Sequence, residues 1–261
     1  MKYLLRCVSY FTAFIFCFSF FSCASQSRYV TNVIDGDTIV TSDGMRIRYI
    51  GLNTPEKGQK YYQEALEFNR KLVQGKEIYI EFDEEKTDSF GRSLAYVYVQ
   101  QENPVFVNEA ILKTGFAMEF YRSPNGKYRK ILKRAEEEAK RQGLYLFQPS
   151  PYQSSLVVYD FQYDAEGDDN QNINGEWIVL GNTSSDPIHL QDFYFYDESF
   201  HRYIFPEIIL ESGKSIKIFT GSGENTDQFI YAGFSSPIWN NSGDSFILYD
   251  FEHRYVLEES Y

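Results

Sequence analysis

The chain has 261 residues, of which 43% are hydrophobic and 18% aromatic, so it can bury the cores of two modest domains, and the aromatic excess is typical of β-rich cores. The formal net charge of −12 is unevenly spread, because residues 24–150 hold 19 Lys and Arg against 18 Asp and Glu, whereas residues 151–261 hold 4 against 19. The C-terminal part is therefore a poor candidate for binding a phosphate backbone, which needs Lys and Arg.

The first 22 residues predict a secretory signal peptide rather than a part of the fold. Lys2 and Arg6 give a short basic start, and the apolar and aromatic run of residues 8–21 ends in small residues. The run is short for a membrane span, which needs roughly 20 residues. We therefore expect an exported protein.

Cys23 is the expected site of lipidation. Residues 20–23, Phe-Phe-Ser-Cys, are similar to a relaxed bacterial lipobox, with Phe20 where Leu would be expected. Cleavage before Cys23 predicts a lipoprotein anchored to a membrane of the bacterial cell envelope and facing outside the cytoplasm. There are two alternatives: the chain is cleaved nearby and carries no lipid, or the segment stays uncleaved as an anchor. Cys7 and Cys17 lie inside the signal, so no pair of cysteines remains for a disulfide.

Residues 24–148 predict a first domain of short strands and three helices. Strands are expected at residues 29–33, 38–40, 45–52, 77–82 and 94–99. Helices are expected at residues 61–73, 107–114 and 128–142, and a glycine follows each of the last two. This pattern is typical of a small barrel with helices packed on it. Residues 149–155, rich in Pro and Ser, predict a linker.

Two polar motifs lie early in this domain. Asp35 and Asp37 flank Gly36 and can present oxygens to one hard cation, although Asp-Gly is also a common hairpin turn. Arg48 lies on an alternating strand, where it points either to a site or to solvent. Each motif taken alone is weak.

Two further motifs follow. In Asn53-Thr54-Pro55-Glu56, Thr before Pro can cap a helix, and Glu56 could be a general base. Arg92 follows a glycine turn and begins a strand, which also suits a plain polar hairpin loop.

Taken together, the order and spacing of these motifs resemble the staphylococcal nuclease (thermonuclease) family over about residues 28–148. The motifs are Val33-Ile34-Asp35-Gly36-Asp37-Thr38, Arg48, Asn53-Thr54-Pro55-Glu56, Thr87-Asp88-x-x-Gly91-Arg92 and Val107-Asn108-Glu109-Ala110. The resemblance implies a mainly β fold, a five-stranded OB-fold barrel with three helices, which commonly binds oligonucleotides. It also implies Ca²⁺-dependent hydrolysis of DNA or RNA that leaves 3′-phosphate ends.

The resemblance assigns catalytic roles to three residues. Glu56 matches the base that orients or deprotonates the attacking water. Arg48 and Arg92 match two arginines that bind the phosphate as its charge builds. Aromatic residues near Phe120 and Tyr121 are expected to stack on bases.

The resemblance also assigns the metal ligands. Asp37 matches the first metal carboxylate, Thr54 matches the residue that gives a backbone carbonyl, and Asp35 matches a supporting acid near the metal waters. Asn53 lies where the family often has a second carboxylate. Because an amide keeps the oxygen ligand but loses the charge, we expect weaker calcium binding rather than lost activity.

Residues 156–261 predict a second, all-β domain. Strands are expected at residues 156–161, 176–180, 188–196, 215–220, 246–249 and 255–257, with turns between them, as in a sandwich. Motifs at residues 176–182, 189–193 and 239–244 resemble the lamin-tail domain, which implies an immunoglobulin-like β-sandwich that interacts with or positions an unknown partner. The acidic pair at Asp197 and Glu198 is expected in a solvated loop, with a calcium loop as the alternative.

Three functions remain open at this point. The leading one is a lipid-anchored nuclease, since Asp37, Arg48, Glu56 and Arg92 occur together. In the second, the barrel binds nucleic acid without cutting it because Asn53 has impaired the metal site. In the third, the acidic C-terminal domain carries the main role as an envelope adhesin or scaffold.

Overall fold

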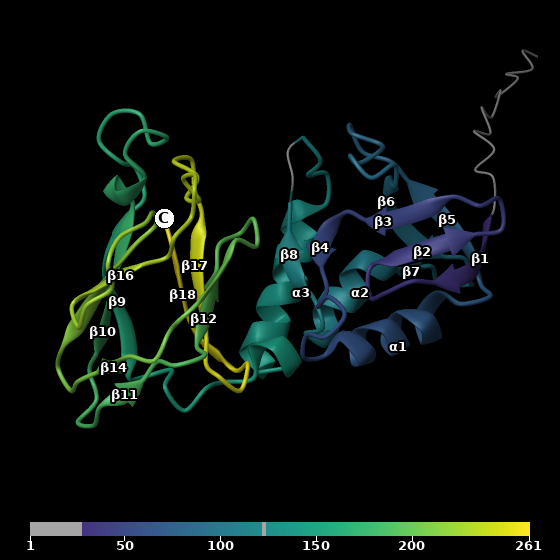
Figure 1. The fold of residues 1–261 in the computed structure, drawn as a ribbon. Coiled ribbons are helices and arrows are strands. Elements are labelled where there is room, and N and C mark those ends of the chain that lie inside the picture. The colour runs from purple at the N-terminus through teal and green to yellow at the C-terminus, as the bar shows by residue number, and fades with distance from the viewer. Residues whose placement is uncertain (1–27, 122–123) are drawn as a thin grey trace, which may run out of the picture.

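The computed structural model describes residues 28–121 and 124–261, and the predicted signal peptide and Cys23 lie outside them. Figure 1 shows two domains side by side, the first purple to teal and the second green to yellow. The first domain contains β1 (Arg28–Val33), β2 (Thr38–Thr41), β3 (Arg46–Tyr49), β4 (Gly51–Asn53), α1 (Tyr62–Val73), β5 (Glu77–Glu81), β6 (Ser93–Val99), β7 (Val105–Phe106), α2 (Val107–Thr114), β8 (Met118–Phe120) and α3 (Arg129–Gln142). No helix in the described ranges combines the length and apolarity that a membrane crossing requires.

The first domain is a closed barrel. Its strands run in the order β3-β2-β1-β5-β6, and β6 pairs with β3 in parallel to close the ring. The short strand β7 pairs with β6 in antiparallel. Alternating apolar residues of these strands, such as Ile39, Ile47 and Val97, are fully buried in its core. The predicted five-stranded OB-fold barrel with three helices is confirmed.

The strand expected at residues 45–52 is divided into β3 and β4. Gly51 causes the break: its φ is +83°, and a Cβ there would lie 2.6 Å from Leu132 Cδ1 on α3. Beyond this turn the chain leaves the barrel, and β4 pairs with β8, with Leu52 opposite Glu119. The break therefore carries Asn53 and the residues after it out of the barrel wall.

The second domain is a sandwich of short strands. Its elements are β9 (Leu156–Gln162), β10 (Trp177–Asn182), β11 (Ile188–His189), β12 (Tyr194–Tyr196), β13 (Arg202–Ile204), β14 (Ile209–Leu210), β15 (Ser215–Phe219), β16 (Phe229–Tyr231), β17 (Ser245–Tyr249) and β18 (Tyr255–Ser260). Two four-stranded sheets, β16-β15-β10-β9 and β13-β12-β17-β18, bury a shared apolar core that includes Ile178, Ile218, Phe246 and Leu248. The prediction of a following β-rich domain is confirmed.

The two domains pack on a third, smaller core. Met118 and Phe147 of the first domain pack with Tyr194, Ile247 and Tyr249 of the second. The segment expected to be a linker takes part in this contact. Ser150 is buried, its backbone N–H donates to the Tyr255 carbonyl at 2.8 Å, and its hydroxyl donates to Asp250 at 2.7 Å. The sheet that contains β12 and β17 therefore faces the barrel (Figure 1).

Candidate active site

The turn between β1 and β2 presents two carboxylates. Asp37 is 5% exposed, and its Oδ2 accepts hydrogen bonds from the Thr54 backbone N–H at 3.0 Å and hydroxyl at 2.9 Å. Gly36 permits this contact, because a Cβ there would lie 2.7 Å from the Thr54 side chain. Asn69 on α1 donates to the Asp35 carbonyl at 2.9 Å and thereby fixes the turn to the helix. The structure thus joins the first and third sequence motifs.

Arg48 lies beneath this turn and is only 8% exposed. Its Nε faces Asp37 Oδ1 at 3.1 Å, and Nη2 donates to Asn53 Oδ1 at 2.8 Å. Nη1 donates to the carbonyls of Tyr49 and Leu52 at 2.7 and 2.8 Å. The alternative of a solvent-facing Arg48 is therefore wrong, because most of its five N–H donors hold the Gly51 turn, Asn53 and Asp37 together.

The oxygen atoms around the turn suit a hard divalent cation. Asp35 and Asp37 supply carboxylates, Asn53 an amide oxygen and Thr54 a backbone carbonyl, which are the ligand types that such ions prefer. Burial, followed by the negative charge of Asp37, raises the pKa of Asp35 to about 6. By chemical type these oxygen donors fit the predicted metal, and in this structure those of Asp37 and Asn53 accept from Arg48 and Thr54.

The described ranges hold no cluster of three or more His, Cys, Asp or Glu with a metal-binding arrangement. At this turn there are two carboxylates, and the third position is Asn53, an amide. The site therefore carries less negative charge than one with a third carboxylate.

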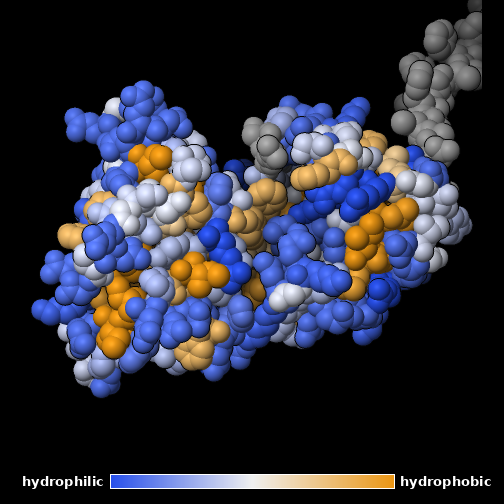
Figure 2. Space-filling view, viewed as in Figure 1, coloured by the Kyte–Doolittle hydropathy of each residue, from blue (hydrophilic) through white to orange (hydrophobic). Residues whose placement is uncertain are grey.

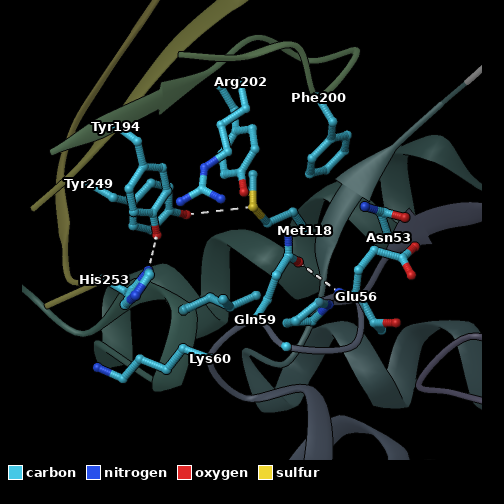
Figure 3. A pocket seen from close by; sticks show the side chains of 15 residues that line it. Asn53, Glu56, Gln59, Lys60, Met118, Tyr194, Phe200, Arg202, Tyr249 and His253 are labelled. Carbon is cyan, nitrogen blue, oxygen red and sulfur yellow. Dashed lines mark hydrogen bonds between the residues drawn. The ribbon is translucent and has the colours of Figure 1, made fainter. Parts of the chain in front are cut away.

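Glu56 lies at the mouth of a cavity of about 370 Å³ that Asn53 and Thr54 also line. Its side chain is exposed, and its carboxylate accepts no hydrogen bond or ion pair from the protein within the part of the chain described. The Glu56 backbone N–H donates to Gln59 Oε1 at 2.7 Å, which shapes the loop before α1. Figure 3 shows Glu56 and Asn53 on the same side of this cavity. A carboxylate free of partners is available to accept a proton.

Arg92 lies apart from this group. It precedes β6, whose Ser93 pairs with Ile47 of β3, and its Nε contacts Asp88 Oδ2 at 2.6 Å. Arg92 does not line the cavity, so the structure does not bring it into contact with Glu56. Its role in binding phosphate stays a prediction.

The opposite wall of the cavity comes from the second domain. Tyr194, Tyr196, Phe200, Arg202 and His253 line it. Figure 3 shows Phe200 on the side where Asn53 and Glu56 lie, whereas the guanidinium of Arg202 lies on the side of Tyr194. Sequence reasoning missed these residues because they lie far from the nuclease-like motifs along the chain. The weak signal available was that Arg202 is one of four Lys and Arg residues after residue 150.

Two family models match the chain. The model described as Staphylococcal nuclease homologue matches residues 46–148, and the Lamin Tail Domain model matches residues 149–258. Arg48, Asn53, Thr54, Glu56 and Arg92 lie inside the first match, whereas Asp35 and Asp37 precede it.

Individual proteins are also similar. A thermonuclease of Staphylococcus intermedius is 36% identical over 132 residues, which are 47% of this chain and 77% of that protein. A thermonuclease of Staphylococcus hyicus is 35% identical over 125 residues, 44% of this chain and 72% of its own. The SPbeta prophage-derived endonuclease YokF of Bacillus subtilis (strain 168) is 38% identical over 130 residues, 46% of this chain and 43% of its own.

Proposed function

We propose that this chain, which belongs to the staphylococcal nuclease family and is a nuclease, hydrolyses DNA or RNA outside the cytoplasm with Ca²⁺ as its cofactor. One observation carries the proposal. Asn53, Thr54 and Glu56 line one cavity, and hydrogen bonds tie Asp37 and Arg48 directly behind them. Acidic, amide and basic groups are thus arranged around one point.

The calcium ion would be held by Asp37, Asn53 and the Thr54 carbonyl, with Asp35 supporting, and when bound would supply positive charge to a phosphoryl oxygen. Arg48 holds Asn53 and Asp37 in place. The second N–H of its Nη2 would donate to a phosphate oxygen. This arrangement gives Arg48 a positioning role as well as a binding one.

Glu56 is the proposed proton acceptor. A water molecule held beside its free carboxylate loses one proton to Glu56 while its oxygen bonds to phosphorus. The bond from phosphorus to the 5′ oxygen then breaks, and that oxygen takes up a proton from solvent water, while Glu56 returns its own proton to solvent. The products are a 3′-phosphate end and a 5′-hydroxyl end. Arg92 is proposed to bind the phosphate through its Nη groups, which have no protein acceptor in the described residues.

The cellular location rests on the N-terminal sequence. A basic start, an apolar run and Cys23 support export and lipid anchoring to the bacterial envelope. Calcium at millimolar concentration outside the cell would suit a site with one carboxylate fewer, because ligand charge tunes calcium affinity. Nucleic acid in the surroundings is the proposed substrate.

Calcium removal tests the proposed function directly. We expect purified residues 24–261 to cut single-stranded DNA in the presence of about 10 mM calcium and to lose nearly all cutting in excess chelator, with recovery when calcium is restored. Gel analysis of end-labelled DNA and RNA would measure the cutting and the phosphate position. A folded chain that binds DNA but never cuts it at any calcium concentration would favour the non-catalytic binding module.

Replacing Asn53 by Asp tests the metal ligand assignment. We expect Asn53→Asp to lower the calcium concentration for half-maximal cutting by about 10-fold, because a second carboxylate ligand adds negative charge to the site. The new carboxylate would still accept from Arg48 Nη2, so the local structure should remain. A calcium titration of the initial rate measures this. Gln59→Glu, a charge change on the same loop, serves as the control, and an equal shift in both variants would contradict the assignment.

A further inference from the structure

The β12–β13 hairpin is held in one conformation beside the active site. Asp197 lies in the turn of this hairpin and is fully buried rather than solvated. It accepts a hydrogen bond from the His201 backbone N–H at 2.7 Å, and its other carboxylate oxygen lies 2.6 Å from His201 Nδ1. Phe200 adopts a φ of +64°, which is uncommon for a bulky residue. Conformations of this kind persist where the surroundings enforce them, and they cluster at binding sites.

Phe200 connects the hairpin to the nuclease domain. Its ring lies 5.4 Å from the Phe120 ring on β8 and 5.6 Å from the Tyr196 ring. The side chain is half-buried and also lines the cavity that Glu56 and Asn53 border. An aromatic ring in the wall of this cavity is suited to stacking on an unpaired base.

Arg202 brings a positive charge to the same wall. Its guanidinium lies 4.3 Å from the centre of the Tyr194 ring and 5.7 Å from that of Tyr196. It forms no hydrogen bond or ion pair with any residue of the described ranges, and its side chain is exposed. In contrast, Arg254 in the same acidic domain is paired with Asp250 and Glu252. The N–H donors of Arg202 are therefore oriented by aromatic rings and available to a phosphate.

Two more basic groups lie on this cavity. Lys60 Nζ donates to the Glu252 carbonyl at 2.6 Å, across the two domains, and His253 Nδ1 lies 3.0 Å from the Tyr194 hydroxyl. Burial, followed by the positive charges of Lys60 and Arg202, lowers the pKa of His253. Among the described residues that line the cavity, Lys60 and Arg202 carry positive charge and Glu56 carries negative charge, so an anionic group is favoured on the side of Lys60 and Arg202.

The wall is fixed relative to the nuclease domain. The Tyr249 hydroxyl lies 3.5 Å from the Met118 sulfur, and Lys140 of α3 pairs with Glu258 of β18. Figure 2 shows that the surface is hollowed between the two domains. Arg202 and Phe200 are thus held opposite Glu56 without any need for domain closure.

We propose that the C-terminal domain forms a nucleotide subsite of the active site, in which Phe200 stacks on a base next to the cut bond and Arg202 binds a neighbouring phosphate. The proposal rests on the nuclease function, and its ligand is a single-stranded segment of the substrate, since only unpaired bases expose their faces for stacking. It gives the lamin-tail-like domain a direct part in substrate binding.

The test separates binding from cutting. For the full chain cutting a fluorescent 12-nucleotide oligothymidylate with calcium, we expect Phe200→Ala and Arg202→Gln each to raise KM about 10-fold and to change kcat less than 3-fold. In a Glu56→Gln background, fluorescence anisotropy should show the same loss of affinity without cleavage. Phe200→Tyr, which keeps the ring, should restore most of the binding.

Lys217→Gln is the matched control. Lys217 is also a cation over an aromatic ring, 3.3 Å from the centre of the Trp177 ring, but it lies outside the cavity and should leave KM unchanged. Circular dichroism and thermal unfolding identify any variant that fails to fold. If folded Phe200→Ala and Arg202→Gln keep the parental KM and affinity while the parent cuts, the subsite is overturned and the nuclease function stands. If the parent never cuts, the nuclease function fails, and the anisotropy series still decides the subsite.

Discussion

Replacing Glu56 by Gln is expected to lower kcat for cleavage of single-stranded DNA by about 10²–10⁴-fold, the usual contribution of a positioned general base. Gln has nearly the same shape as Glu but cannot accept the proton of the attacking water. The Glu56 carboxylate is exposed and lacks protein partners in the described residues, so the substitution should not cost stability. The reason for the loss is therefore chemical, and KM should change little.

Single-turnover cutting with saturating calcium measures the chemical step for Glu56→Gln. Glu64→Gln is a suitable control, because Glu64 is an exposed carboxylate in the first turn of α1, close in sequence but outside the cavity. A Glu56→Gln chain that keeps a kcat within 2-fold of the parent would remove Glu56 from the mechanism. The nuclease assignment would then need another proton acceptor.

Replacing Arg48 by Ala is expected to reduce both stability and activity. The substitution leaves the buried Asp37 charge without its cation and frees the acceptors on Asn53, Tyr49 and Leu52. Breaking a buried ion pair on one side typically costs about 3–5 kcal/mol. The lost phosphate donor should reduce kcat by a further factor of about 10²–10³. Denaturant unfolding gives the first number, and cutting rates under conditions where the variant is folded give the second.

Arg46→Ala provides the comparison for Arg48→Ala. Arg46 lies two residues earlier on β3 but is exposed, so its loss should change the free energy of unfolding by less than about 0.5 kcal/mol. If Arg48→Ala were as stable as Arg46→Ala, the hydrogen bonds around the Gly51 turn would contribute little to the free energy of unfolding. If it were destabilised but fully active once folded, Arg48 would be structural alone.

Much of the barrel could be predicted because local signals and packing agree there. The helices end at Gly115 and Gly143 as expected, and both glycines adopt positive φ at the helix ends. The sequence predicts one continuous strand over residues 45–52, but its apolar residues change phase from Met45, Ile47 and Tyr49 to Ile50 and Leu52 on either side of the break. Only the approach of Leu132 from α3, 81 residues later, shows why that position must be glycine.

The site could be predicted in part. The motif order pointed to Asp37, Arg48, Asn53, Thr54 and Glu56, and the structure brings these residues together. It could not indicate that Arg48 would be buried, because a two-residue alternation fixes the face of a strand but not what covers that face.

Sequence patterns could not predict which residues of the second domain line the cavity. The β12–β13 hairpin was not predicted, since the run over residues 188–196 was read as one strand and β13 was missed. Asp197 was expected in a solvated loop because acidic residues usually are exposed. Buried Asp197 is satisfied by hydrogen bonds with His201, which form only in the folded chain.

The small core around Met118, Phe147 and Tyr249 makes the distance between the two walls of the cavity a property of the packing between domains. Met118 and Tyr249 also line the cavity, so this packing sets both its shape and the position of its two walls. A smaller side chain at Tyr249 would let β12 and β17 shift against α3 and move Arg202 relative to Glu56. Natural variation on the C-terminal strands would then adjust which substrates fit, while the motifs on the barrel stayed the same. In this chain the second domain packs against the first and forms one wall of the cavity.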